Sequence, residues 1–295
     1  MAAKVEITHP DRVLFPADGI TKGDLVEYYS EIARVMVPHL KDRPLTLWRY
    51  PRGIDQKGFV QQDFADSLPD WMGRVKVSKE DGTLVHPTAE GRDALRWLAN
   101  QNCVIVHAWL SRRDRLHTPD RIVFDLDPSS SDFAVVKATA RTVADVLDDL
   151  GLVSYVQTTG SRGLHVVTPL RGDADFDTVR QFARDVADVV AADDPKHRTV
   201  EMRKAKRGDR VYLDIMRNAY AQTAVAPYAV RARRGAPVAT PLEWDELGRR
   251  GLRADLFTIR DVPKRVAERG DPWTDLARRG RALTHPAQRL VKIHA

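Results

Sequence analysis

The chain has one cysteine in 295 residues, Cys103, so it cannot form an internal disulfide. This excludes the small secreted scaffolds that disulfides hold together. The sequence also lacks any apolar run of the roughly 20 residues that a membrane-spanning helix needs. Its first residues, MAAKVEITHP, contain no apolar stretch of the signal-peptide type. These absences predict a cytoplasmic protein in which Cys103 is a buried thiol.

Basic residues outnumber acidic ones only slightly, 47 to 41, for a formal net charge of +6. That balance alone identifies no partner. The basic residues are clustered, however, in the runs Arg-Lys-Ala-Lys-Arg (203–207) and Arg-Ala-Arg-Arg (231–234). Such runs can neutralise nucleic-acid phosphates. A solvated surface is the simpler interpretation of either run taken alone.

Hydrophobic residues make up 43% of the chain and charged residues 30%, as in ordinary globular proteins. Apolar runs predict strands, and apolar positions spaced three or four apart predict helices. Strands are expected over 45–50, 103–109, 121–127, 152–157, 164–169, 211–216 and 224–231, and helices over 22–39, 92–98, 132–150 and 176–191. Residues 1–22 are predicted as loop, and residues from 241 onward as mixed helix and loop.

This order of elements predicts an α/β (α+β) fold with a mixed central β-sheet and flanking helices. The chain shows no internal repeat, low-complexity tract or flexible linker. We therefore expect a single domain over residues 1–295. Within it we expect an N-terminal segment of about 1–60, a catalytic core of about 100–235 and a C-terminal helical segment of about 240–295.

Two aspartates share one face of the strand predicted at 121–127. Successive side chains of a strand point to opposite faces, so Ile122, Phe124 and Leu126 face the core. Asp125 and Asp127 then share the other face. Carboxylates placed in this way repel each other and lose solvation unless a cation lies between them. A bound divalent metal resolves that conflict.

The strand predicted at 211–216 adds a third carboxylate. Its apolar residues Val211, Leu213 and Ile215 face one way, and Asp214 faces the other. Three carboxylates can hold two metal ions about 3.5–4 Å apart, as in polymerases and nucleases. An isolated Asp-x-Asp at a strand end is more often a turn or a helix cap. A third aspartate on a second apolar strand favours a catalytic metal site.

The segment Thr158–His165 joins two predicted strands and contains small hydroxyls, two glycines, a guanidinium and an imidazole. Backbone N–H groups beside glycines can approach an anion, and the side chains add donors. The segment therefore predicts a triphosphate cradle. It is not a Walker P-loop, because Lys-Ser/Thr is absent and a strand follows where a helix should. A plain hairpin turn explains the glycines alone, and His107 alone is most simply a core side chain.

These motifs resemble the polymerase domain of bacterial ligase D, within the archaeo-eukaryotic primase superfamily. The resemblance rests on Asp125-Leu126-Asp127-Pro128, Thr159-Gly160-Ser161-Arg162-Gly163-Leu164-His165, and Val211-Tyr212-Leu213-Asp214 with Arg217-Asn218. It extends through 9–16, 21–22, 43–44, 53–55, 223–228 and 236–242, so it covers nearly the whole chain. It implies that the fold is a primase-polymerase catalytic core.

The resemblance implies a DNA-dependent polymerase that adds ribo- or deoxyribonucleotides to DNA 3′ ends, in gap filling or non-homologous end joining. Asp125, Asp127 and Asp214 would bind Mn²⁺ or Mg²⁺ in a two-metal site. The residues implied for the incoming nucleotide are Phe59, His107, Thr159, Ser161, Arg162, His165, Arg217 and Arg231. Arg12 and Lys22 would bind the 5′-phosphate of a gapped or broken DNA end. The implied partners are DNA, nucleoside triphosphates, Ku and a separate DNA ligase, with no membrane, in a cytoplasmic and nucleoid-associated setting.

The chain departs from the family's usual pattern at several positions. Thr-Gly-Ser-Arg-Gly (159–163) stands where Ser-Gly-Gly-Lys-Gly is common, and Val60 follows Phe59 where a second aromatic is usual. The turn keeps a hydroxyl and a cation, so we expect nucleotide binding to persist with a different stack at the base. Three other functions use the same residues. They are a stand-alone primase, a nuclease, which would need no triphosphate cradle, and a non-catalytic DNA-end-binding scaffold, which the intact aspartates disfavour.

End recognition has a further argument in the helix predicted from Lys22. Thr21 is a suitable N-cap, and a helix start presents N–H groups and a partial positive charge. Together with Arg12 and Lys22, these groups would favour a terminal 5′-phosphate over a hydroxyl. The alternative is that both residues are solvated surface charges.

Overall fold

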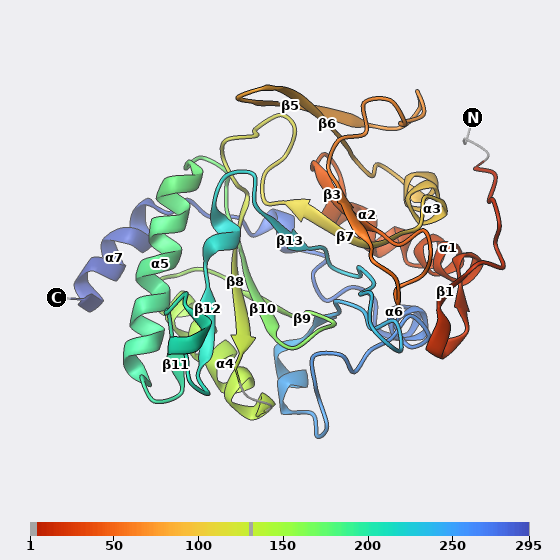
Figure 1. The fold of residues 1–295 in the computed structure, drawn as a ribbon. Coiled ribbons are helices and arrows are strands. Elements are labelled where there is room, and N and C mark those ends of the chain that lie inside the picture. The colour runs from red at the N-terminus through yellow and green to blue at the C-terminus, as the bar shows by residue number, and fades with distance from the viewer. Residues whose placement is uncertain (1–4, 130–131, 295) are drawn as a thin grey trace. The chain divides into compact units, whose positions relative to one another are not determined.

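The computed structural model describes residues 5–129 and 132–294. The chain forms two compact units, each assembled from three separate stretches. Figure 1 shows the ribbon with its helices and strands labelled. Unit 1 comprises Met1–Asp114, Val225–Thr240 and Asp255–Asp271, and unit 2 comprises Arg115–Ala224, Pro241–Ala254 and Pro272–Ala295. The expectation of one domain over residues 1–295 stays a prediction.

Unit 2 is built on a six-stranded sheet in the order β11-β12-β8-β10-β9-β14. The strands are β8 (Arg121–Pro128), β9 (Tyr155–Thr158), β10 (Leu164–Pro169), β11 (Arg198–Thr199), β12 (Val211–Asp214) and β14 (Pro241–Leu242). The β11–β12 pair is parallel and the other pairs are antiparallel, so the sheet is mixed, as expected. The helices are α4 (Phe133–Asp149), α5 (Phe176–Asp193) and α7 (Thr284–His294), with short 3-10 turns η2 (Lys204–Lys206), η3 (Met216–Asn218), η4 (Trp244–Gly248) and η5 (Leu276–Arg278).

The sequence explains the ends and the buried face of α4. Asp132 caps the helix, because its carboxylate accepts a 2.9 Å hydrogen bond from the Ala134 amide. The stripe Val136, Ala140, Val143 and Leu147 is fully buried. Gly151, with φ of +80°, follows the C-cap in the left-handed conformation that glycine adopts most easily.

Unit 1 contains the antiparallel sheet β7-β3-β4, made of β3 (Leu45–Arg49), β4 (Phe59–Gln61) and β7 (Cys103–Trp109). It also holds the hairpins β1 (Val13–Phe15) with β2 (Ile20–Thr21), joined by η1 (Pro16–Asp18), and β5 (Arg74–Lys79) with β6 (Gly82–Pro87). Its helices are α1 (Lys22–Glu31), α2 (Ala33–Leu40), α3 (Arg92–Asn100) and α6 (Val262–Arg269), and the chain returns to unit 1 within β13 (Thr223–Val225). Cys103 is fully buried, as predicted, and burial raises the pKa of its thiol to about 12.

Several predicted boundaries were wrong. The helix expected over 22–39 is two helices, because the chain turns at Ile32, where φ is −86° and ψ is 1°. The apolar spacing continues through that turn, so the sequence pattern does not reveal it. Residues 1–22 include a short hairpin, and the strand expected over 224–231 shortens to β13. No helix among the described residues is both long and apolar enough to cross a membrane.

His86, on β6, is expected to make the stability of the protein depend on pH. It is 1% exposed, it lies against Trp109, and its Nδ1 is 3.0 Å from the carbonyl oxygen of Leu45. Burial lowers the pKa of His86, while the hydrogen bond to Leu45 and the charge of Asp63 act in the opposite direction. The folded protein therefore binds fewer protons at this site than the unfolded chain does. Stability is lost as the pH falls through the unfolded value of about 6.5.

The measurement is the thermal unfolding midpoint between about pH 7 and pH 5. The midpoint of the wild type should fall over this range. His86→Gln, which keeps a donor for Leu45, should show a smaller fall, whereas His285→Gln, at an exposed histidine of α7, should behave as the wild type does. Identical pH dependence in all three proteins would show that His86 is not the responsible group.

Candidate active site

The register of unit 2 places three polar residues side by side at the centre of the sheet. Asp125 of β8 is the direct partner of Asp214 on β12 and of His165 on β10. Directly opposed residues of an antiparallel pair have Cβ atoms about 4.5–5.5 Å apart on the same face. The apolar residues between them, Phe124 and Leu126, are fully buried on the other face. The alternation predicted for β8 and β12 is therefore observed, although β12 ends at Asp214 rather than at residue 216.

Asp125 has basic partners on two sides. Its Oδ1 lies 3.4 Å from Nε2 of His165, and its Oδ2 lies 3.3 Å from Nε of Arg217. The side chain of Asp125 is only 16% exposed. Burial raises the pKa of this carboxyl, but the charges and hydrogen bonds of His165 and Arg217 outweigh burial and lower the pKa to about 2. In this structure Arg217 supplies a cation beside Asp125, which offsets the repulsion expected between bare carboxylates.

The pKa of Asp214 is shifted in the opposite direction. Burial, followed by the negative charges of Asp125 and Asp127, raises its pKa, although the Met216 amide donates a 2.8 Å hydrogen bond to Oδ1. Arg217 offsets the repulsion only in part. The carboxylate repulsion that the sequence predicts is thus concentrated at Asp214, which makes this residue the one that would gain most from a cation.

Asp127, at the end of β8, is more open than Asp125. Its side chain is 40% exposed, and its Oδ1 lies 3.4 Å from a guanidinium nitrogen of Arg162, which is 52% exposed. Two exposed side chains at this distance form a weak, solvent-screened ion pair. Arg162 can therefore leave Asp127 at little cost when a stronger anion is present.

The glycine turn between β9 and β10 is held together by Thr159. Its Oγ1 accepts hydrogen bonds from the amides of Ser161 (3.3 Å) and Gly163 (3.2 Å), and the Thr159 amide donates to the Gly163 carbonyl. Thr159 is 6% exposed. Two amides of the expected phosphate cradle are thus used inside the turn, which leaves Arg162 as its exposed donor side chain.

One residue that positions the site was missed in the sequence. Gln157 of β9 is 1% exposed, and its amide nitrogen lies 3.3 Å from Nδ1 of His165. With Nδ1 accepting from this amide, the imidazole proton lies on Nε2 and points towards Asp125. The available signal was a carboxamide in a predicted strand, two positions before the turn; the structure then pairs it in register with His165.

The donor chemistry of the three aspartates suits a hard divalent cation such as Mg²⁺ or Mn²⁺, which prefers carboxylate oxygens. Within 5–129 and 132–294, no three Asp, Glu, His or Cys side chains converge closely enough to form a metal site. Instead, Arg217 and Arg162 neutralise the carboxylates of Asp125 and Asp127. The residues fit a metal chemically, and binding would require these guanidinium groups to withdraw.

The other residues expected at the nucleotide lie in unit 1. Phe59 of β4 is 46% exposed, and the guanidinium carbon of Arg49 lies 5.5 Å from its ring centre. His107 of β7 packs on the Trp48 ring at a centroid distance of 4.2 Å. The amide of Arg231 donates to the Pro237 carbonyl. Burial raises the pKa of Tyr50, and the positive charge of Arg231 opposes that shift in part. The stacking role expected for Phe59 stays a prediction.

Lys22 is a buried cation with neutral hydrogen-bond partners. It is 1% exposed, and among the described residues its ammonium bonds to the Thr8 hydroxyl (3.1 Å) and the Asn100 carbonyl (3.4 Å). Burial and the positive charge of Arg12 lower its pKa. Two neighbouring cations in such surroundings are stabilised by an added anion. The solvated-surface alternative is therefore wrong for Lys22.

The start of α1 does not offer the free amides that the sequence suggests. Thr21 and Asp24 form a reciprocal capping box, the Lys22 amide donates to the Arg12 carbonyl, and the Gly23 amide donates to the Pro10 carbonyl. Because these donors are already used, the helix start is not itself an anion site. Any anion bound beside α1 would be held by side chains.

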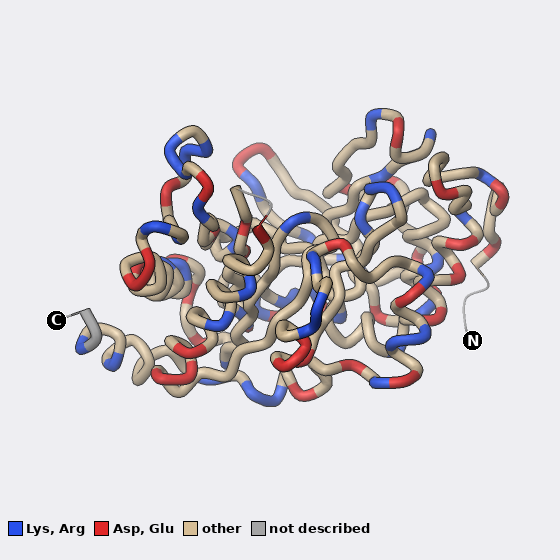
Figure 2. Tube along the Cα trace, turned by 90° about the horizontal axis from the view of Figure 1, so that it is seen from below, with Lys and Arg blue, Asp and Glu red and all other residues tan. Residues whose placement is uncertain are grey.

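Basic and acidic residues are interspersed along the chain (Figure 2). Within the run 203–207, Arg207 has a structural role: its guanidinium lies 3.7 Å from the centre of the Tyr212 ring and donates to two loop carbonyls. Arg203, Lys204 and Lys206 are exposed. The run is therefore divided between structure and surface, and it identifies no site by itself.

Comparison with known proteins places this geometry in a family. Residues 21–273 match the family described as LigD, primase-polymerase domain. The multifunctional non-homologous end joining protein LigD of Mycolicibacterium smegmatis is 37% identical over 91% of this chain, and the bifunctional LigD protein of Bacillus subtilis is 32% identical over 93%. This chain spans 35% and 44% of the lengths of these two relatives.

A solved structure supports the same assignment. The polymerase domain from Mycobacterium tuberculosis ligase D, solved in complex with DNA, aligns with a TM-score of 0.89 and 34% identity. The alignment covers 94% of this chain and 99% of that domain. The expected mixed α/β fold and the expected enzyme class, nucleotidyltransferase, are confirmed. The chain belongs to the LigD primase-polymerase domain family.

Proposed function

We propose that the protein extends DNA 3′ ends by template-directed nucleotide addition, filling gaps or processing broken ends in non-homologous end joining. The observation that carries this proposal is the alignment of Asp214 and Asp125 on neighbouring strands with Asp127 beyond them, in a member of a polymerase family. The relatives named for end joining, and the neighbour solved with DNA, support the substrate class.

The chemistry proposed is in-line attack of the primer 3′-hydroxyl on the α-phosphate of the nucleotide, with pyrophosphate leaving. Mn²⁺ or Mg²⁺ held by Asp125, Asp127 and Asp214 would supply Lewis acidity and charge neutralisation at the phosphates. Asp125 is ionised at neutral pH because its pKa is about 2. His165, fixed by Gln157, would orient Asp125, and Arg162 would turn from Asp127 to the triphosphate.

A single assay distinguishes this function from its alternatives. A primed template is incubated with the protein, nucleotides and Mn²⁺, and the product length is read on a gel. Extension of the primer is expected. Synthesis without a primer indicates a primase, shortening indicates a nuclease, and no change indicates a DNA-end-binding scaffold. Ku and a separate ligase are proposed partners, to be tested by adding them to an end-joining reaction.

Arg162→Ala is expected to raise the nucleotide KM by about 10-fold or more, because a charge-assisted contact contributes about 1.5–3 kcal/mol when formed. Binding of DNA without nucleotide should hardly change. Arg180→Ala, which removes an arginine paired with Asp177 on α5, is the matched control and should leave the KM unchanged. Loss of DNA binding with an unchanged nucleotide KM would instead make Arg162 a contact to the DNA backbone.

Lys22→Met is expected to abolish most of the preference for a 5′-phosphorylated gap while leaving extension of a simple primer intact. Methionine fills the space of the buried lysine stem, and the substitution removes a cation whose partners among the described residues are neutral. The fold should therefore tolerate the change. The wild type should bind the phosphorylated gap more tightly than the hydroxyl gap, by about 1.5–3 kcal/mol for each desolvated contact.

The measurement is a titration of gapped DNA with and without the downstream 5′-phosphate, at fixed salt because phosphate contacts are sensitive to salt. Lys264→Met, at a lysine of α6 that is 79% exposed, is the control for loss of one positive charge and should keep the preference. Equal affinity of the wild type for the two gaps would refute end recognition by this pair of residues.

A further inference from the structure

Asn218 is a fully buried polar residue that none of the roles above uses. Its carboxamide bonds to both polar groups of one residue of β8: Oδ1 accepts from the Val123 amide at 2.8 Å, and Nδ2 donates to the Val123 carbonyl at 2.8 Å. Nδ2 also donates to the Ile215 carbonyl at 2.9 Å. The carboxamide of Asn218 therefore bonds to the backbone of β8, the strand that carries Asp125, and to the residue that follows β12.

These hydrogen bonds take the place of those that β12 would make with Val123 if the strand continued beyond Asp214. The β12–β8 pairing runs to Asp214 opposite Asp125, so a longer β12 would next satisfy Val123. Instead the chain turns at Ile215, where φ is −102° and ψ is 0°, and enters η3. Without a substitute, the peptide groups of Val123 would lie buried and unpaired, which is strongly unfavourable. The carboxamide of Asn218 provides the one donor and the one acceptor that a peptide group would have provided.

This substitution allows the chain to leave the sheet directly after Asp214. The early turn brings the Met216 amide to 2.8 Å from Oδ1 of Asp214, and it brings Nε of Arg217 to 3.3 Å from Oδ2 of Asp125. A continued strand would instead carry the Met216 amide along the β-ladder. The geometry of the two opposed carboxylates thus depends on the bonds that Asn218 makes two residues along β8 from Asp125.

We propose that Asn218 is a positioning residue for nucleotidyl transfer: by standing in for a strand residue opposite Val123, it fixes η3 so that Asp214 is held opposite Asp125. This inference rests on the proposed polymerase function. A purely structural role would affect stability alone, whereas a positioning role also changes the cation affinity of the carboxylates and the rate of the chemical step.

The test uses Asn218→Asp and Asn218→Ala. The first keeps the size of the side chain and the acceptor for the Val123 amide but loses both donors, and the second leaves room for water at Val123. Mn²⁺ affinity, measured by the electron paramagnetic resonance signal of free Mn²⁺ without DNA or nucleotide, should fall by about 10- to 100-fold, as expected when an outer-shell partner is lost. A fall in the Mn²⁺ affinity of Asn218→Asp would support the proposal strongly, because the added negative charge by itself would strengthen cation binding. The rate of extension at saturating nucleotide should fall by about 100-fold with little change in KM.

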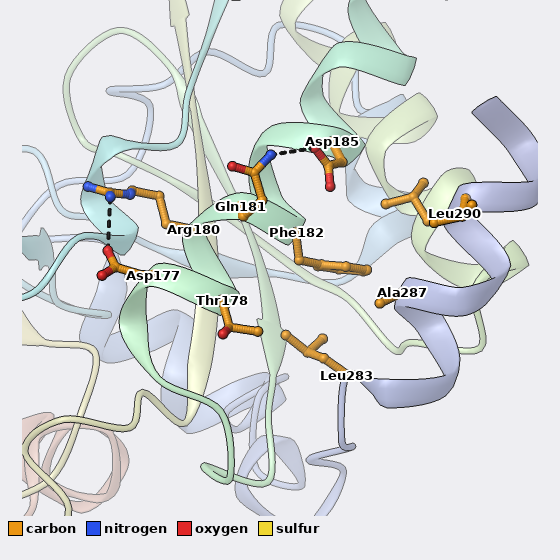
Figure 3. A pocket seen from close by; sticks show the side chains of 10 residues that line it. Asp177, Thr178, Arg180, Gln181, Phe182, Asp185, Leu283, Ala287 and Leu290 are labelled. Atoms are coloured by element: carbon orange, nitrogen blue, oxygen red, sulfur yellow. Dashed lines mark hydrogen bonds and ion pairs between the residues drawn. The ribbon is translucent and has the colours of Figure 1, made fainter. Parts of the chain in front are cut away.

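Leu290→Ala is the matched control. Leu290 is 2% exposed on α7 and packs towards Phe182 of α5 (Figure 3), so its truncation destabilises unit 2 through an element that contributes no carboxylate. This variant should lose thermal stability and keep its Mn²⁺ affinity and extension rate. Asn218 variants with wild-type Mn²⁺ affinity and rate, or with losses that Leu290→Ala reproduces, would overturn the inference while the polymerase function stands. A wild type that neither binds Mn²⁺ nor extends a primer would refute the proposed function, and the inference with it.

Discussion

Asp214→Asn and Asp125→Asn are both expected to lower the rate of nucleotide addition by on the order of 10³-fold. Each substitution removes a negative charge that the transition state of the transfer would need. Their effects on stability should have opposite signs. Asp214 has a raised pKa from burial and from the charges of Asp125 and Asp127, so its ionised form opposes folding at neutral pH. Asp125 has a pKa lowered to about 2 by His165 and Arg217, so its ionised form favours folding.

The signs follow from proton linkage. For Asp214, the folded protein binds more protons than the unfolded chain, so stability is lost as the pH rises through the folded pKa, and Asp214→Asn should raise the unfolding midpoint at pH 7. For Asp125, the stabilisation is present above the ordinary carboxyl value near 4 and is lost as the pH falls towards 2, so Asp125→Asn should cost about 2 kcal/mol at pH 7.

The comparison requires thermal unfolding and primer extension of the same preparations at pH 7. Asp149→Asn, at an exposed aspartate that ends α4, is the control and should match the wild type in both measurements. Stabilisation by Asp125→Asn, or extension at the wild-type rate by either variant, would contradict the electrostatic description of the site.

The sequence identifies the aspartates because strand alternation is a local property. Phe124 and Leu126 determine which face of β8 is buried, and Asp125 is then necessarily on the other face. Local pattern does not determine which side chains from other strands approach those carboxylates. The ion pair of Arg217 with Asp125 depends on the turn after β12, and the contact of Gln157 with His165 depends on the β9–β10 register. These tertiary contacts offset the repulsion that the sequence predicts between Asp125 and the neighbouring carboxylates.

The turn at 159–163 shows the same limit. Its composition suggested an anion cradle, with the glycines present so that backbone amides could approach a phosphate. In the structure, the hydroxyl of Thr159 takes up the amides of Ser161 and Gly163, and Gly163 lies against the backbone of β8. A run of small residues predicts that another group comes close to the backbone of the turn. The sequence does not say whether that group is a ligand or a neighbouring strand.

Gly163→Ala is accordingly expected to damage both stability and activity. A Cβ at this position would lie 1.9 Å from the carbonyl oxygen of Leu126 and 3.0 Å from its carbonyl carbon. Both atoms belong to the backbone of the central strand β8, so no side-chain rotation can relieve the clash. The turn and β10 must shift away from β8, at a cost of about 3 kcal/mol or more. For a chain of this size that corresponds to an unfolding midpoint lower by roughly 6–12 °C.

The same displacement separates groups that the active site needs together. Leu164 pairs with Leu126, and His165 pairs with Asp125, so a shift beginning at Gly163 is transmitted within two residues to the imidazole that lies 3.4 Å from the carboxylate. Extension by the folded fraction should therefore fall by about 100-fold, as expected for a displacement of about 1 Å. Gly248→Ala is the matched control, since a Cβ there meets no atom within 4 Å. If Gly163→Ala instead matched Gly248→Ala in midpoint and rate, the close contact between this turn and β8 would not be a feature of the folded protein in solution, and Gly163 would be available for the anion-binding role that the sequence first suggests.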